Sequence, residues 1–106
     1  MSEAVYMIGI IDVNDFQTYA EQYGMPVGAL FAEVGAEIIV ASDTVEILEG
    51  SWPGTWTVIV KVPSAEVAKE LYHSDRYAPF RKARIEQLAK DSTLVIVPEL
   101  DPAGLS

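Results

Sequence analysis

The sequence predicts an α+β domain in which an antiparallel sheet carries helices on one face. The chain has 106 residues and 50% of them are hydrophobic, which is enough for one domain with its own core. Strand-like and helix-like segments follow one another in the order strand, helix, strand, strand, helix, strand. This order is typical of the ferredoxin-like βαββαβ fold.

The first half of the chain begins with a strand and a broken helix. β-branched and aromatic residues dominate Ala4–Ile11, and the polar residues at 12–15 suit a turn and a helix N-cap. The helix is expected in two pieces, because Gly24 ends the first apolar stripe and Pro26 restarts a turn. Gly35 is the expected C-cap of the second piece.

Two strands and a helix start are expected in the middle of the chain. Residues 36–41 and 45–49 should form one long bent strand, or a strand with a short ribbon. Residues 55–62 alternate most clearly, with Trp56 opening an apolar face that three valines continue. Ser64 is the expected N-cap of the next helix.

A second helical run and a last strand complete the fold. The helical run is expected from about Asp75 to Lys90, with a kink or a 3₁₀ start because Pro79 lies deep inside it. The last strand is expected at Leu94–Val97. Residues 1–97 are therefore expected to form a single domain, and residues 98–106 a tail.

Both faces of the sheet are expected to be covered. A sheet with one solvated face alternates apolar and polar residues, but residues 4–11 and 94–97 are apolar at successive positions. In so small a chain the expected cover is a second copy. The sequence therefore predicts a homodimer packed sheet against sheet.

Charge and composition exclude several classes of function. The net charge is −9 and the first 60 residues contain no Lys or Arg, so neither nucleic acid nor an anionic membrane is an expected partner. The chain has no cysteine and one histidine, and its acids show no ligand spacing, so no metal and no cofactor are expected. Without a basic leader or a long apolar run, the expected location is cytoplasmic.

Residues along most of the chain match a family pattern. The less specific ones are Asp12, Tyr19, Tyr23, Gly35, Leu48-Glu49-Gly50, Trp52 and Pro63-Ser64. The most specific ones are Tyr72-His73-Ser74, Tyr77, Arg81 and Arg84. With these residues the chain resembles, over roughly residues 4 to 97, a bacterial domain-of-unknown-function family, number thirteen-thirty in that series, within the dimeric α+β barrel superfamily.

The resemblance implies a dimer whose sheets face each other, with a small pocket between sheet and helices. The superfamily includes cofactor-free monooxygenases, isomerases of small lactones and haem-using enzymes, so the fold alone does not select a chemistry. The family usually has a basic residue near the start of the third strand, where this chain has Trp56. The pocket is therefore expected to be more apolar than is typical.

A cluster of basic residues marks the candidate site. Four of the seven Lys and Arg residues lie between positions 76 and 84, a stretch without any acid. At about 100° per residue, Arg81 and Arg84 fall within roughly 40° of Tyr77, in the middle of the apolar face. Each inward arginine is expected to meet an anion, because an unpaired buried charge is costly.

Two interpretations of these arginines stay open. In the first, they hold the structure by pairing with the chain's own acids, which are Glu49, Asp12 or Glu46. In the second, at least one of them lines a pocket for an anionic or enolisable small molecule.

The candidate residues follow from the second interpretation. His73 is the only side chain here whose ordinary pKa lies near neutrality, so His73 and Tyr77 are the candidate catalytic residues, although His73 also suits a surface or capping role. The candidate substrate-binding residues are Arg81, Arg84, Trp56 and Glu49. The expected function is a cofactor-free oxygenase or isomerase, and the alternative is a non-catalytic dimeric module that binds a small molecule or has a structural role.

Overall fold

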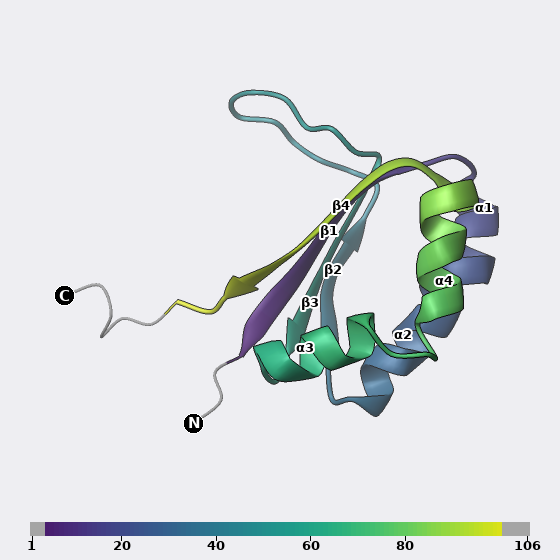
Figure 1. Ribbon diagram of the computed structural model, residues 1–106. Helices are drawn as coiled ribbons and strands as arrows, with labels where there is room; N and C mark the ends of the chain where they lie inside the picture. Colours follow the sequence, from purple (N-terminus) through teal and green to yellow (C-terminus); the bar gives the residue numbers. More distant parts are fainter. Residues whose placement is uncertain (1–3, 101–106) are drawn as a thin grey trace.

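A four-stranded antiparallel sheet forms one layer of the molecule, and the helices cover one of its faces (Figure 1). The computed structural model describes residues 4–100. The strand order is β2-β3-β1-β4, with bounds β1 Val5–Val13, β2 Glu37–Ser42, β3 Trp56–Val62 and β4 Ala89–Pro98. The helical elements are α1 Phe16–Tyr19, η1 Ala20–Gly24, α2 Met25–Glu33, α3 Ala65–Tyr72, α4 Ala78–Ala83 and η2 Arg84–Leu88. Within the described residues, no helix is long and apolar enough to cross a membrane.

The first helical segment runs without a break from Phe16 to Glu33, where the sequence predicted two pieces. It starts at the predicted turn, with Asp15 as its N-cap. Its middle, η1, is a π-helical turn that closes with a bond from the Met25 N–H to the Ala20 carbonyl. Pro26 lacks an N–H and crowds the carbonyl four residues before it, and the wider π-turn relieves that conflict without ending the helix.

A long irregular loop joins β2 and β3. Residues 43–55 contain no strand, so the predicted strand or ribbon at 45–49 is wrong. The loop projects beyond the end of the sheet, away from the helices (Figure 1), and nearly all its side chains are exposed. Apolar residues there have no neighbouring strand to pair with, and an isolated ribbon is marginal in water.

Of the two helices between β3 and β4, the first starts where predicted and the second starts later. Ser64 caps α3 as expected, accepting a hydrogen bond from the Val67 N–H at 3.2 Å. Between α3 and α4 the chain turns, and α4 begins at Ala78 instead of Asp75. Pro79 consequently stands in the first helical turn, where a missing N–H breaks no hydrogen bond.

The last strand is longer than predicted. β4 starts at Ala89 instead of Leu94, because its backbone pairs with β1 along the whole length of that strand, and an edge strand tolerates polar side chains. Beyond β4, the Glu99 N–H donates to the Ala4 carbonyl at 3.1 Å. The remainder of the expected tail, from residue 101, lies outside the described residues.

The two faces of the sheet differ in what covers them. On the helix face, alternate residues of β1 from Val5 to Ile11 are buried against the helices. On the outer face, the strand register aligns Ile8 with Ile59 and Val95, and Val95 is 43% exposed. The sheet is thus apolar on both faces, as predicted, and no helix of the described chain covers the outer one (Figure 1).

Candidate functional site

The guanidinium of Arg84 lies buried between the sheet and the helices, and the residue is 3% exposed. Its Nη1 donates hydrogen bonds to Tyr77 Oη at 2.9 Å and to Tyr23 Oη at 3.0 Å. The two hydroxyl oxygens share a further hydrogen bond at 2.5 Å. The guanidinium also lies 5.6 Å from the centre of the Tyr23 ring. These three residues, Arg84, Tyr23 and Tyr77, are called the Arg84 cluster below.

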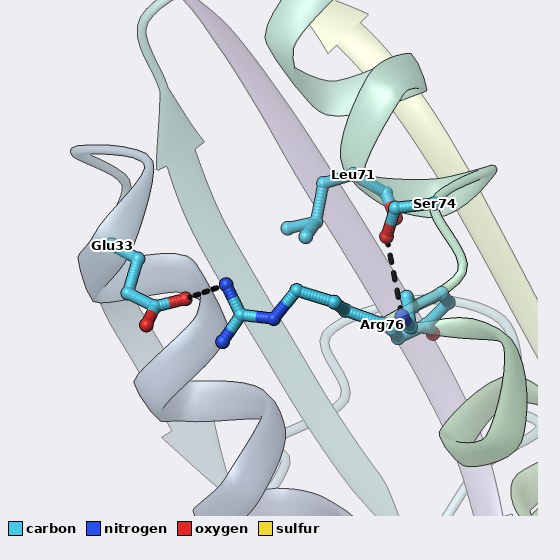
Figure 2. A network of polar contacts seen from close by, with 5 residues as sticks. Glu33, Leu71, Ser74 and Arg76 are labelled. Carbon is cyan, nitrogen blue, oxygen red and sulfur yellow. Dashed lines mark hydrogen bonds and ion pairs between the residues drawn. The ribbon is translucent and has the colours of Figure 1, made fainter.

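A tight turn after α3 positions Tyr77. The Ser74 hydroxyl donates to the Leu71 carbonyl at 2.7 Å and accepts a hydrogen bond from the Tyr77 N–H at 3.2 Å. In the same turn, Arg76 reaches across to α2 and forms an ion pair with Glu33 at 2.6 Å (Figure 2). The turn is therefore tied to α3 and, through Glu33, to the first helical segment, which contributes Tyr23 to the cluster.

The other two members of the cluster stand on π-helical turns. Tyr23 belongs to η1 and Arg84 is the first residue of η2. In the helix layer (Figure 1), α4 packs beside η1 and η2 packs beside α1, and η2 follows directly from α4. Single π-turns inside helices are frequent at functional sites, and here they bring the two side chains to one point.

No carboxylate of the described chain balances the charge of Arg84. The ion pairs formed by residues 4–100 are Lys61–Glu99 and Arg76–Glu33, both on the surface. The first interpretation, in which Arg81 and Arg84 pair with the chain's own acids, is therefore wrong, since neither forms an ion pair with Asp12, Glu46 or Glu49. The physical reason is that the side chains facing Arg84, Tyr23 of η1 and Tyr77 of the turn before α4, present phenol oxygens instead of carboxylates.

The surroundings of the cluster shift the pKa values of Tyr77 and Arg84. Desolvation raises the pKa of Tyr77 far above its ordinary value, the neighbouring Tyr23 raises it further, and Arg84 opposes the shift only in part. Tyr77 thus stays protonated at neutral pH and can donate a hydrogen bond. Desolvation acts to lower the pKa of Arg84, but the oxygens of Tyr23 and Tyr77 outweigh it and the pKa lies above its ordinary value.

The cluster holds more hydrogen-bond donors than acceptors. One of the two phenol hydrogens forms the bond between the hydroxyls, which leaves the other without a described acceptor. Arg84 Nε is buried and has no hydrogen-bond partner among the described residues. The site therefore suits an anion better than a metal ion. In residues 4–100 no group of three His, Asp or Glu side chains is arranged to hold a metal.

Of the cavities that border the Arg84 cluster, two are adjacent to each other, and a third, at the surface, is also lined by Tyr72, Lys90 and Asp91. The inner cavity, of about 40 Å³, is lined by the cluster together with strand residues that include Gly9 and Ser92. The outer cavity, of about 200 Å³, lies between the first helical segment and strands β2 and β3. Phe16 and Trp56, whose ring centres are 4.7 Å apart, form part of its wall. Tyr23 lines both cavities, so it marks the boundary between them.

The remaining candidate residues lie away from the cluster. Arg81 donates to the Tyr72 carbonyl at 2.7 Å and covers the Tyr72 ring, so it caps the end of α3. His73 is exposed and lines a separate surface groove beside β4. Glu49 is exposed in the loop at 43–55. The structure thus brings Tyr77 and Arg84 together and places Trp56 in the adjacent cavity.

Tyr23 is the site residue that the sequence interpretation missed. The sequence placed Tyr23 and Tyr19 only in the family pattern, with no role in the site, but the two residues are 8% and 2% exposed. The available signal was that both share the apolar face of one helix, where a buried tyrosine hydroxyl requires a hydrogen-bond partner. An inward arginine elsewhere in the chain could have supplied that partner.

These features define a ferredoxin-like α+β domain with a buried Arg–Tyr–Tyr site. The chain belongs to the family described as Domain of unknown function (DUF1330), which matches residues 4–100. The predicted family and fold class are therefore confirmed. A comparison with curated proteins found no match.

Solved structures of bacterial proteins share the fold. A protein of unknown function from Rhodopseudomonas palustris is 18% identical, with a TM-score of 0.75 over 96% of this chain and 86% of that chain. A protein from Bacteroides fragilis, described as dimeric, of unknown function and of ferredoxin-like fold, is 11% identical, with a TM-score of 0.60 over 91% and 96%. A NIPSNAP family protein from Agrobacterium tumefaciens is 18% identical, with a TM-score of 0.59 over 100% and 94%. At these identities the likeness extends to the fold alone.

Proposed function

We propose that this protein binds a small molecule through a negatively charged oxygen held by the Arg84 cluster. One observation carries the proposal: Arg84 is a residue only 3% exposed, and its guanidinium has only phenol hydroxyls as hydrogen-bond partners among the described residues. Two buried donors, Arg84 Nε and one phenol hydrogen, are left over. A carboxylate or enolate oxygen in the inner cavity would accept from them.

The energetics favour an anionic ligand. An isolated charge in a protein interior costs several kcal/mol, and the phenols offset this cost with hydrogen bonds but without opposite charge. An anion adjacent to Arg84 supplies that charge, and charge-assisted hydrogen bonds are about twice as strong as neutral ones. The free energy of binding then offsets the free-energy cost of burying the Arg84 guanidinium.

Stabilisation of an enolate is a second candidate function, favoured by the protonated Tyr77 beside the charged Arg84. Such donors act as an oxyanion hole when negative charge develops on a substrate oxygen. The inner cavity is lined by no carboxylate and no histidine in the described chain, and His73 lines a different groove. A cofactor-free oxygenase or isomerase would therefore act here on substrates whose enolates form without a base from the protein, such as acidic 1,3-dicarbonyl compounds.

Acetate and the enolate of acetylacetone test both candidates. We expect each to raise the midpoint of thermal unfolding of the wild type, by an amount that grows with ligand concentration. Arg84→Met should remove this response, whereas Lys82→Met, which removes an exposed charge from the same helical segment, should keep it. Equal stabilisation of the wild type and Arg84→Met would refute the proposed site. A response to acetate but not to acetylacetone would refute the enolate candidate alone.

We also propose that a second copy of the chain covers the outer face of the sheet. The face carries a continuous apolar surface across three strands, including Ile8, Ile59 and Val95. Val95 is 43% exposed, and large exposed apolar patches mark interaction surfaces. The Bacteroides fragilis protein of the same fold is described as dimeric, which supports a self-complementary arrangement.

Analytical ultracentrifugation tests the dimer. The wild type should sediment as a dimer at micromolar concentration, and Val95→Lys should sediment as a monomer because it places charges in the interface. Ala32→Lys, on the exposed side of α2, is the matched control and should remain dimeric. A monomeric wild type would contradict the proposal.

A further inference from the structure

We infer that the ligand is a monoanion with one apolar body of about the size of a single ring. The body occupies the outer cavity, and a carboxylate or similar oxyanion reaches the Arg84 cluster through the inner cavity. This inference rests on the proposed function and adds to it the class of ligand.

The size of the outer cavity limits the apolar body. Its volume is about 200 Å³, and an apolar cavity of about 150 Å³ in another protein is known to accept benzene. The inner cavity of about 40 Å³ has room for a group of a few atoms but not for a second ring. A compact apolar group with a short acidic arm fits the two cavities together.

The chemistry of the walls limits the charge. The outer cavity is lined by no charged residue, and its walls include Phe16, Met25, Ile38 and Trp56. Arg84 is the one charged residue that lines the inner cavity. Neither cavity offers a second cation from the described chain, so a dicarboxylate or a phosphorylated molecule would leave a charge without a partner. The site therefore selects a single negative charge.

Glycines in the first helical segment widen the outer cavity. Gly24 and Gly28 lie one turn apart and both line it. Neither needs to be glycine for its backbone, because the glycines with positive φ are Gly35 and Gly50. A glycine inside a helix costs roughly 1 kcal/mol relative to alanine. At Gly28 the absence of a side chain leaves open space in the cavity, because a Cβ there would lie 3.7 Å from Ile38 Cδ1, which is another part of the cavity wall.

The two cavities are placed so that one molecule can use both. They share Tyr19, Tyr23, Phe31 and Val58 as lining residues. The ring of Tyr23 contributes to the outer wall, while its hydroxyl takes part in the Arg84 cluster. An apolar body resting on this ring therefore has its acidic arm within reach of Arg84.

Calorimetric titration of three probes tests the ligand class. Phenylacetate combines a ring with one carboxylate, acetate has the carboxylate without the ring, and 2-phenylethanol has the ring without the charge. We expect phenylacetate to bind the wild type at least tenfold more tightly than either of the others. Arg84→Met should lower the affinity for phenylacetate to that for 2-phenylethanol.

Substitutions that fill the outer cavity provide a second test of the ligand class. Gly28→Leu should lower the affinity for phenylacetate at least tenfold and leave that for acetate unchanged. Ala29→Leu makes a similar enlargement at the next, exposed position of α2 and should leave both unchanged. Gly28→Ala adds a single methyl group at an ordinary contact distance and should weaken phenylacetate binding in a folded protein even if Gly28→Leu fails to fold.

The outcomes separate the two proposals. If acetate binds in an Arg84-dependent way but phenylacetate binds no more tightly, the ligand class is refuted and the proposed function stands. If 2-phenylethanol binds as tightly as phenylacetate, and Arg84→Met changes neither, the anion site itself is refuted. If no probe binds, both proposals are overturned.

Discussion

Replacing Arg84 by methionine separates a ligand-binding role from a structural one. Methionine has a similar length and no charge, so Arg84→Met removes the guanidinium and leaves an apolar side chain in its place. Tyr23 and Tyr77 keep the hydrogen bond that joins their hydroxyls. The substitution therefore creates no large cavity and no isolated polar group.

The contacts of Arg84 allow the expected change to be estimated. Arg84 donates two hydrogen bonds, and each contributes about 1.5–3 kcal/mol to stability when one partner is charged. Its contact with the Tyr23 ring adds about 2 kcal/mol when desolvated. Burying the charge without an opposite one costs several kcal/mol, which is a comparable amount. We therefore expect Arg84→Met to change the free energy of unfolding by less than about 2 kcal/mol in either direction.

Urea denaturation followed by tryptophan fluorescence measures this change. Without ligand, Arg84→Met and the wild type should have similar midpoints and equal m-values. With phenylacetate at a hundred times its dissociation constant for the wild type, the free energy of unfolding should rise by about 2.7 kcal/mol in the wild type and stay unchanged in Arg84→Met. A loss of more than about 3 kcal/mol in the absence of ligand is typical of breaking a buried ionic network. That result would refute the reasoning and assign Arg84 to the structure of the core.

Three further predictions concern stability. Ser74→Ala should lower the free energy of unfolding by about 1 kcal/mol, because the Ser74 hydroxyl bonds both the Leu71 carbonyl and the Tyr77 N–H; an unchanged urea midpoint would contradict this. Gly28→Ala should raise it by about 0.5–1 kcal/mol through helix propensity, and a loss would show that the added Cβ clashes with Ile38. Since the pKa of Tyr77 is raised in the folded state, its stabilising contribution is complete below the unfolded value of about 10 and is lost as the pH rises above it. Urea titrations from pH 7 to 11 should therefore show a shallower alkaline loss for Tyr77→Phe than for the wild type, and parallel losses would contradict the assignment.

Much of the fold could be predicted from local sequence signals. Asp15 and Ser64 cap their helices as expected, because a side chain can cap a helix without help from the rest of the protein. Gly35 ends the first helical segment with φ of +77°, a conformation that glycine adopts without strain. Errors arose where pairing partners decide the outcome. Backbone pairing with β1 extends β4 into polar sequence, whereas the apolar residues at 45–49 have no strand beside them.

The candidate site was predicted only in part, because local signals give the direction of a side chain but not its distant partners. Helical phase turns Arg84 and Tyr77 to the same side, and they meet at 2.9 Å. Phase could not say that Arg81 would cap α3, because its acceptor, the Tyr72 carbonyl, becomes available only where that helix ends. Nor could it identify Tyr23, which is far from Arg84 in the chain.

The sequence by itself determined the order of the elements, the apolar character of both sheet faces and the inward direction of Arg84. These properties follow from local periodicity and composition, which need no knowledge of distant contacts. The tertiary structure alone decided which groups surround that arginine. The packing of the first helical segment beside α4 and η2 sets two phenol hydroxyls, one from η1 and one from the turn before α4, against the guanidinium, and no carboxylate of the described chain pairs with it. A charge is balanced by whatever the fold places within a few ångströms, and that depends on segments far apart in the chain.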